Sequence, residues 1–230
     1  QSIPWPTDGS NRHLAATRNN LLHFIRGYTV NETTGGFATT DLYRNRVALL
    51  GDIVNAQPAY VKAPPFNYVD PFYIDYKNAK GPRRGTVFAA ANDGMLHAFE
   101  TDPDGVPYFQ TGGIATPATL DDTFTGTLST NPVSGEGSER WAYIPTMVLP
   151  TLKRLAETNY ATNHRFSTDG SPVVGDICFD HTLSTPCSAE SKWRTILVAG
   201  LNAGGRGYYA LDVTDPLNPK ALWELKGGAG

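Results

Sequence analysis

Residues Val87–Glu100 read VFAAANDGMLHAFE, two short apolar runs separated by Asn92-Asp93-Gly94. Asp-Gly between apolar segments is a strong hairpin signal, because the central positions of the tightest turns need a positive φ. We therefore predict a β-hairpin here, with its turn at Gly94.

The same pattern recurs in Thr195–Asp212, TILVAGLNAGGRGYYALD, where a glycine-rich turn spans Asn202–Gly207. With two extra residues allowed in this second turn, Ala98-Phe99-Glu100 aligns with Ala210-Leu211-Asp212. Glycines permit a wide turn and a close approach of neighbouring backbone. We expect this structural role for four glycines of the two turns: Gly94, Gly204, Gly205 and Gly207.

Both hairpins have the same flanking sequence. Pro58 and Pro172 each precede a short β-prone segment upstream, and Trp141 and Trp223 follow downstream. Together these make a four-stranded unit, and its recurrence is typical of β-propeller blades. We predict an all-β fold of β-propeller type, in which the two tryptophans pack blades together. Because propellers close with about four to eight blades, two units make an incomplete ring.

The chain divides into four segments: residues 1–46 with a helix and a loop, 47–143 as the first blade unit, 144–165 as a short helical connection, and 166–230 as the second blade unit with a linker. The helix of the first segment is predicted from about Leu14 to Arg26. The first unit carries two long insertions, Ala63–Arg84 and Asp102–Ser138, which we expect to decorate one face of the propeller.

The composition supports a turn-rich globular chain. Of 230 residues, 40% are hydrophobic, 11% aromatic and 18% charged, with 23 Gly and 17 Pro. A net charge of -3 and the lack of a basic stripe argue against nucleic acid as a partner. No apolar run approaches the ~18–20 residues of a membrane span. Gln1 does not begin a signal peptide, so we expect either a cytoplasmic protein or a start inside a larger precursor.

Two cysteines, Cys178 and Cys187, lie between two predicted strands. We favour a local disulfide, which would imply an oxidising compartment. The alternative is two unpaired thiols in a cytosolic protein. A metal pair is less favoured, because no second Cys/His pair has matching spacing.

The strongest metal-like fragment is Glu100-Thr101-Asp102-Pro103-Asp104-Gly105. The alternating carboxylates of Glu100, Asp102 and Asp104 resemble the first half of an oxygen-ligand calcium loop. Position twelve of such a loop would be Thr111, where a bidentate Glu is required. We therefore favour a turn that leaves the third strand, with these three residues as weak calcium candidates.

Catalytic signatures are missing from the sequence. The five histidines show no metal-binding spacing, and no Gly-x-Ser-x-Gly nucleophile elbow occurs. His97 falls on the return strand of the first hairpin, where we expect a hydrogen-bonded structural role. We predict no catalytic residues and no enzyme activity.

Several motifs, taken in order, resemble the C-terminal β-propeller of the PilC/PilY proteins, which are type IV pilus biogenesis factors and tip-associated adhesins. The motifs are Leu49-Leu50-Gly51-Asp52-Ile53-Val54, Asn92-Asp93-Gly94-Met95-Leu96-His97-Ala98-Phe99, Trp141-Ala142-Tyr143-Ile144-Pro145, and Gly200 through Pro216. The likeness covers roughly residues 40–226 and follows the family's order of motifs.

The resemblance implies a protein exported through the periplasm to the outer membrane or cell surface, at the pilus tip. There it would support pilus assembly against retraction, twitching motility and surface attachment. Its implied partners are minor pilins of the tip complex and host or abiotic surfaces. The family's calcium loop belongs to a later part of the propeller, so the resemblance implies no cofactor within this chain.

Two other classes of protein share some of these features. Quinoprotein (PQQ) dehydrogenases also use blades whose third strand ends Ala-x-Asp/Glu before a downstream Trp, as in Ala98-x-Glu100 with Trp141. That motif docks blades together, so it indicates architecture and not cofactor chemistry. The remaining alternative is a periplasmic scaffold propeller, which would lack the Gly51-Asp52-Ile53-Val54 signature.

Overall fold

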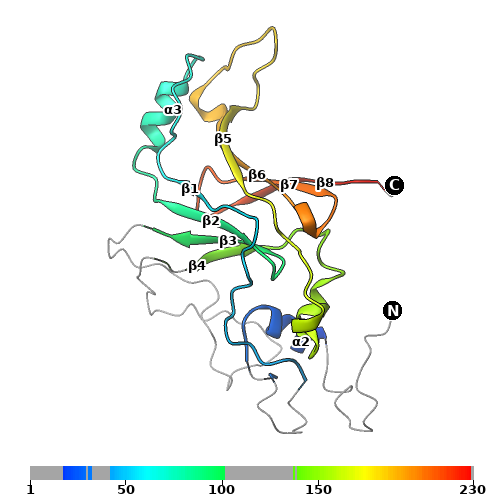
Figure 1. The fold of residues 1–230 in the computed structure, drawn as a ribbon. Coiled ribbons are helices and arrows are strands. Elements are labelled where there is room, and N and C mark those ends of the chain that lie inside the picture. The colour runs from blue at the N-terminus through cyan, green and yellow to red at the C-terminus, as the bar shows by residue number, and fades with distance from the viewer. Residues whose placement is uncertain (1–17, 30, 33–41, 102–136, 138, 229–230) are drawn as a thin grey trace.

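The computed structural model describes residues 18–29, 31–32, 42–101, 137 and 139–228. Two four-stranded antiparallel sheets form the body of this part of the chain, with their strands in sequence order (Figure 1). The first sheet contains β1 (Ala59–Val61), β2 (Thr86–Ala91), β3 (Met95–Glu100) and β4 (Glu139–Tyr143). The second contains β5 (Val173–Cys178), β6 (Trp193–Gly200), β7 (Gly207–Asp212) and β8 (Lys220–Lys226). The predicted all-β, propeller-type organisation is confirmed.

The first hairpin turns where the sequence predicts it. Ala91 pairs with Met95, and Gly94 between them has φ +90°, a left-handed value that glycine adopts without a steric cost. The side chain of Leu152 lies against this glycine, so the turn is also a packing point. Thus both the conformation and the limited space require glycine at this position.

The two sheets repeat each other in register as well as in strand order. In the first, Ala98 pairs with Trp141, and the register shifts directly after Ala98. In the second, Ala210 pairs with Trp223, and the register shifts directly after Ala210. A bulge at the same place shows that the two units are copies of one design, and it confirms the alignment made from the sequence.

Helical segments lie at the margins of the sheets. The described part of the N-terminal helix is α2 (Arg18–Ile25), which ends just before Gly27, at φ +96°. Its predicted first residues lie outside the described chain. The connection between the units contains two 3₁₀ helices, η2 (Leu152–Ala156) and η3 (Tyr160–Thr162), where the sequence predicts one short helix. Two further 3₁₀ turns are η4 (Glu190–Lys192) and η5 (Asn202–Gly204).

The insertion Ala63–Arg84 is not merely a surface decoration. It contains a helix, α3 (Tyr73–Lys80), that the sequence analysis did not predict. Tyr73 and Tyr76 of this helix are fully buried and pack with Trp193 of the second sheet. In Figure 1, α3 stands beside β5 at one end of the molecule. The insertion of the first unit therefore packs against the second sheet.

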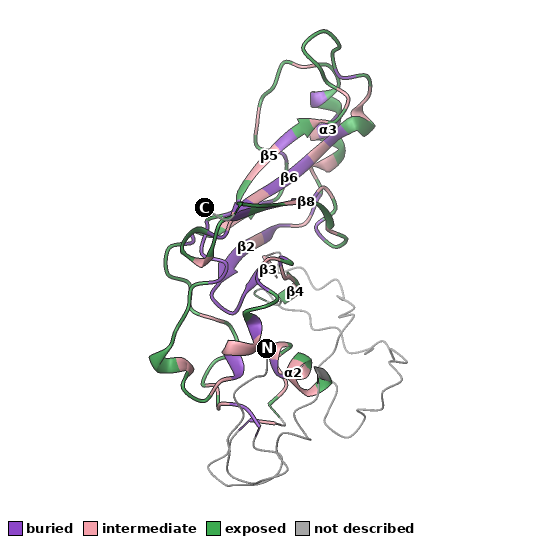
Figure 2. Cartoon of the chain, turned by 90° about the vertical axis from the view of Figure 1, so that its right-hand side faces the viewer, coloured by how far each residue is buried: buried purple, intermediate pink, exposed green. Residues whose placement is uncertain are grey.

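The main core lies between the two sheets. Phe88 and Leu96 of the first sheet meet Leu197 and Tyr209 of the second, and all four are fully buried. Figure 2 shows β2 mostly in purple and β8 mostly in green, so burial falls from the inner strands to the edge of the second sheet. Arg46 attaches α2 to this body, since its guanidinium donates to the Phe24 carbonyl at 2.7 Å and covers the Phe24 ring.

Candidate functional site

A first group of polar contacts joins β4 and the residues after it to the second unit. Trp141 on β4 donates its Nε1–H to the Pro216 carbonyl oxygen at 2.9 Å. Tyr143 donates its hydroxyl to Glu224 on β8 at 2.6 Å, and Thr146 also donates to this carboxylate. Burial opposes the charge of Glu224, but these hydrogen bonds hold its pKa below the usual range. Trp141, Tyr143 and Thr146 thus connect the first unit to the second through hydrogen bonds.

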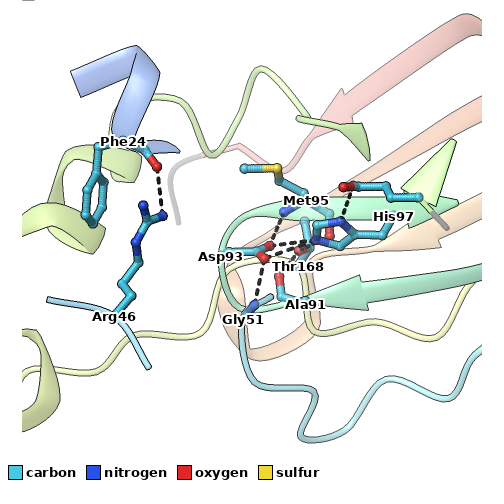
Figure 3. A network of polar contacts seen from close by, with 9 residues as sticks. Phe24, Arg46, Gly51, Ala91, Asp93, Met95, His97 and Thr168 are labelled. Atoms are coloured by element: carbon cyan, nitrogen blue, oxygen red, sulfur yellow. Dashed lines mark hydrogen bonds and ion pairs between the residues drawn. The ribbon is translucent and has the colours of Figure 1, made fainter. Parts of the chain in front are cut away.

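A second group of contacts centres on the hairpin turn (Figure 3). The Asp93 carboxylate accepts hydrogen bonds from the Gly51 amide at 2.8 Å and from the Met95 amide at 3.1 Å. His97 Nε2 lies 3.0 Å from the same carboxylate, and His97 Nδ1 lies 2.7 Å from Glu139 Oε1. His97 thus connects the turn to strand β4, which is the hydrogen-bonded role expected from the sequence.

This arrangement favours a charged imidazole. Burial opposes the charge, but the hydrogen bonds and charges of Asp93 and Glu139 outweigh it and raise the pKa of His97 to about 9. A cation held between two carboxylates in a buried site is a structural clamp, because both ring nitrogens are already used as donors. His97 is therefore poorly suited to accept a proton from a substrate near neutral pH.

We expect the stability of the fold to fall as His97 loses its proton. The folded pKa of about 9 lies above the ordinary value near 6.5, so the stabilisation is complete below about pH 6.5 and is lost as pH rises through 9. The loss is on the order of 3 kcal/mol, because one pKa unit corresponds to about 1.4 kcal/mol. Urea unfolding of the wild type and of His97→Gln, between pH 6 and 9.5, measures it. The variant should lose this pH dependence, whereas His181→Gln, at an exposed position, should keep it.

A third group of contacts connects the turn to the second unit. Asn92 donates from Nδ2 to Asp52 at 2.8 Å and accepts from the Ser167 amide at 3.0 Å. Asn55 donates to Asp169 at 2.7 Å. Because Asn92 and Asp169 are both about 1% exposed, removing either partner would leave a buried polar group without its hydrogen bond.

The base of the α3 insertion forms a fourth group. Tyr73 donates to Asp176 at 2.8 Å, and the Thr195 hydroxyl donates to the same carboxylate at 2.7 Å. Arg83 donates to the Thr195 oxygen at 2.8 Å, and Tyr76 also contacts it at 2.7 Å. Burial and the Asp176 carboxylate raise the pKa of Tyr73 above its ordinary value, so the phenol stays a donor. These contacts fix the insertion on the second sheet.

The metal candidates named from the sequence are placed as follows. Glu100 is buried and forms ion pairs with Arg140 at 2.6 Å and Arg84 at 3.2 Å, which gives its carboxylate a structural role. Asp102 and Asp104 lie outside the described residues, so calcium binding by these two carboxylates stays a prediction. Calcium ligation by Glu100 would require its oxygens to leave two guanidinium groups.

The remaining candidate residues are structural. Cys178 and Cys187 form a disulfide. In the described chain, these cysteines and Asp180 are the one group of His, Cys, Asp and Glu side chains close enough to share a metal ion, and the disulfide uses both sulfur atoms. Gly204 lies directly against the Ser167 carbonyl, Gly205 is the residue after η5, and Gly207 begins β7 beside Met147. Trp223 is 42% exposed.

Sequence reasoning missed the contacts between the units. Asn92 reads locally as a turn residue, and nothing near it indicates Asp52 or Ser167 as its partners. Trp193 lies near the start of a predicted strand, and no residue close to it in the sequence indicates that it packs against α3. The sequence offers one signal for such contacts. The turn itself does not require an asparagine at position 92, so the side chain of Asn92 can form hydrogen bonds with distant residues.

Two repeated four-stranded sheets, docked through a tryptophan and closed by buried polar groups, define this chain as part of a β-propeller protein. A family model described as the PilY1 beta-propeller domain matches residues 50–228. The chain belongs to this family of type IV pilus proteins.

Individual relatives agree with this assignment. The type IV pilus biogenesis factor PilY1 of Pseudomonas aeruginosa (strain PAK) is 34% identical over 210 residues, which cover 88% of this chain and 14% of that protein. A PilY1 homolog of Xylella fastidiosa (strain Temecula1 / ATCC 700964) is 31% identical over 218 residues, covering 92% of this chain and 14% of the relative. The chain thus spans 14% of the length of these relatives.

A solved structure is also similar. The crystal structure of the Pseudomonas aeruginosa PilY1 C-terminal domain matches with a TM-score of 0.43 and 30% identity, over 73% of this chain and 25% of that chain. Among the helices that the structure describes, none has the length and apolar character needed to cross a bilayer.

Proposed function

We propose that this chain is a propeller segment of a type IV pilus biogenesis factor that acts at the pilus tip and supports pilus assembly against retraction. Membership of the PilY1 propeller family over residues 50–228 carries the proposal. Twitching motility and attachment to surfaces would follow from maintained pili. Minor pilins of the tip complex are its proposed partners, and host or abiotic surfaces its proposed targets.

We infer a mechanical role from the contacts between the two units in the described chain. Polar contacts join the two units: Asn92 accepts from the Ser167 amide, and Asn55 donates to Asp169. Tyr76 and Arg83 of the first unit both contact the Thr195 hydroxyl. Such contacts resist separation of the two sheets, because each broken contact exposes a desolvated polar group. Calcium, if this protein uses it, is proposed to bind a later part of the propeller.

Deletion in the organism that encodes this protein tests the role. The residues matched by the family, 50–228, are removed from the chromosomal copy, and surface pili and twitching zones are measured with and without complementation. We expect loss of pili, restored when the retraction motor is also deleted. Normal piliation would contradict a role in biogenesis, and loss that persists without retraction would contradict the action against retraction.

The rival function as a quinoprotein has its own assay. The purified protein is incubated with PQQ and calcium and tested for dye-linked dehydrogenase activity over a panel of alcohols and aldose sugars. We expect no turnover above that of heat-denatured protein. Activity that needs both additions would replace the pilus proposal with an enzyme.

Export through the periplasm fits the disulfide. We expect no free thiol in the unfolded, unreduced protein, and a fall of about 2–3 kcal/mol in the free energy of unfolding when Cys178 and Cys187 are both changed to Ser, because the bridge closes a short loop. Thiol titration and urea unfolding measure these effects. Reductant should destabilise the wild type and leave the double variant unchanged. Two reactive thiols in the wild type would contradict the prediction.

A further inference from the structure

A cavity of about 560 Å³ lies between the connection of the two units and the glycine-rich turn of the second unit. The connection lines most of it, from Thr151 to Ser167, and Ala203 and Gly204 of η5 line the rest. Cavities of roughly 300–1,000 Å³ are the usual size of small-molecule sites in proteins. The volume therefore suits a small molecule and not the flat contact of a large protein surface.

Both walls of this cavity are held in place by the fold. Leu152 and Leu155 of η2 are buried in the main core, which fixes the first wall. Ser167 donates its amide to Asn92, and its carbonyl lies against Gly204 of the second wall. The cavity thus exists before any ligand binds, so binding would not carry the cost of ordering its walls.

The charged side chains of the lining are basic. Arg154, His164 and Arg165 line the cavity, and among the described residues no carboxylate side chain does. Asp52 lies 2.9 Å from His164 Nε2 but is not part of the lining. Within the same described part of the chain, neither arginine has a side-chain hydrogen bond or an ion pair. Guanidinium groups pair with carboxylates through two parallel hydrogen bonds, so the lining favours a ligand that carries a carboxylate.

Aromatic rings form part of the same lining. The His164 ring meets the Tyr160 ring at a centroid distance of 5.6 Å and the Phe166 ring at 5.5 Å, both edge to face. The Arg44 guanidinium lies over the Tyr160 ring at 4.5 Å, and Phe166 is 38% exposed. Such rings offer apolar surface against which the C–H groups of a ligand can pack. The ligand should therefore carry C–H surface beside its carboxylate.

Two threonine hydroxyls of the lining set a further requirement. Thr151 donates its hydroxyl to the Val148 carbonyl at 2.8 Å, and Thr162 donates to the Asn159 carbonyl at 2.9 Å. Because a hydroxyl has one hydrogen and two lone pairs, both threonine oxygens remain available as acceptors. The ligand should therefore also carry hydrogen-bond donors, such as hydroxyl groups.

We propose that this cavity binds an acidic sugar, such as a uronic acid. The carboxylate of the sugar pairs with Arg154 and Arg165. One face of its ring packs on Phe166, and its hydroxyl groups donate to Thr151 and Thr162. A glutamate or aspartate side chain of a partner protein would supply the carboxylate but no ring that carries both hydroxyl groups and C–H surface. The proposal goes beyond the pilus function and does not depend on it.

Ligand titration of the 230-residue chain tests the proposal. Galacturonate, glucuronate and N-acetylneuraminate are added in turn while amide chemical shifts are followed by nuclear magnetic resonance, and galactose serves as the neutral match of galacturonate. We expect at least one acidic sugar to bind with a Kd on the order of 1 mM, as is usual for a ligand of this size. Galactose should bind at least about tenfold more weakly, because it lacks the charged acceptor. Equal binding of galactose, or no saturable binding of the three acidic sugars up to tens of millimolar, would overturn the proposal.

Variants separate a sugar site from general charge attraction and from a contact with a protein. Arg154→Gln and Arg165→Gln should each weaken binding of the acidic sugar by about tenfold or more. Arg206→Gln, at an exposed position outside the lining, should leave the Kd unchanged, and thermal unfolding checks that all three variants are folded. Equal weakening by all three would show non-specific attraction and contradict the proposal. If a glutamate-rich peptide binds more tightly than every sugar and loses affinity in Arg165→Gln, the cavity serves a protein partner and the proposal is wrong.

Discussion

Replacing Trp193 with alanine is expected to lower the free energy of unfolding of this chain by about 3–5 kcal/mol. The Trp193 ring is 4% exposed and packs against Tyr73 at a centroid distance of 4.8 Å and Tyr76 at 6.3 Å. Its Nε1–H also donates to the Pro71 carbonyl at 3.0 Å. The substitution would therefore leave a cavity under α3 and remove the hydrogen bond to Pro71, just before that helix.

Two controls isolate the cause of that loss. Trp193→Phe keeps an aromatic ring and removes the donor to Pro71, so about 1–2 kcal/mol should be lost. Trp223→Ala removes the same kind of side chain from an exposed strand and should cost less than about 1 kcal/mol. Urea unfolding followed by circular dichroism measures all three. Equal effects at Trp193 and Trp223 would show that Trp193 does not anchor the insertion.

Hydrogen exchange gives the prediction a local readout. Beyond the Trp193 cluster, α3 is attached to the second sheet by the hydrogen bonds of Tyr73 with Asp176 and of Tyr76 with Thr195. We therefore expect α3 to open first when the cluster is removed. In Trp193→Ala, amides of Tyr73–Lys80 should exchange faster while those of β3 stay protected. Uniform acceleration across both sheets would instead indicate global destabilisation.

The strands and their register could be predicted from the sequence because their signals are local. Asp93-Gly94 fixes the turn. The match of Ala98-Phe99-Glu100 to Ala210-Leu211-Asp212 identifies equivalent positions, at which the structure shows a bulge in both units. A strand pairs with its sequence neighbour here, so the order of strands follows directly from the order of the apolar runs. Because the four-stranded pattern occurs twice, the sequence alone allowed the propeller-type architecture to be predicted.

The helix α3 and the polar interface could not be predicted because their causes are distant. Tyr73 and Tyr76 lie in a polar, proline-containing insertion that lacks a clear helical pattern of apolar residues. They are buried only because they pack against Trp193, which is distant in the sequence. Glu100 resembles a calcium ligand in the sequence because its ion-pair partner, Arg140, lies beyond a long insertion and is not visible as a neighbour. The local sequence shows that a side chain is polar, but only the fold shows which groups form its hydrogen bonds and ion pairs.

Replacing Gly204 with alanine is expected to cost about 3 kcal/mol or more. A Cβ at this position would lie 1.7 Å from the Ser167 carbonyl oxygen and 2.7 Å from its Cα, so backbone and not a flexible side chain would have to move. Ser167 donates its amide to Asn92 at 3.0 Å. Displacing it would therefore strain the contact between the second unit and the hairpin turn of the first.

Gly175 supplies the matched control for this effect. A Cβ added at Gly175 in β5 would meet nothing within 4 Å, and alanine there should leave the free energy of unfolding within about 1 kcal/mol of the wild type, or raise it, because the unfolded chain loses freedom. Thermal unfolding of both variants measures the difference. If Gly204→Ala were as stable as Gly175→Ala, the close approach of η5 to Ser167 would not hold the two units together. A large difference would show that the glycine-rich turn serves the interface between the blades, and that its glycines are required by contact with Ser167 and not only by the turn itself.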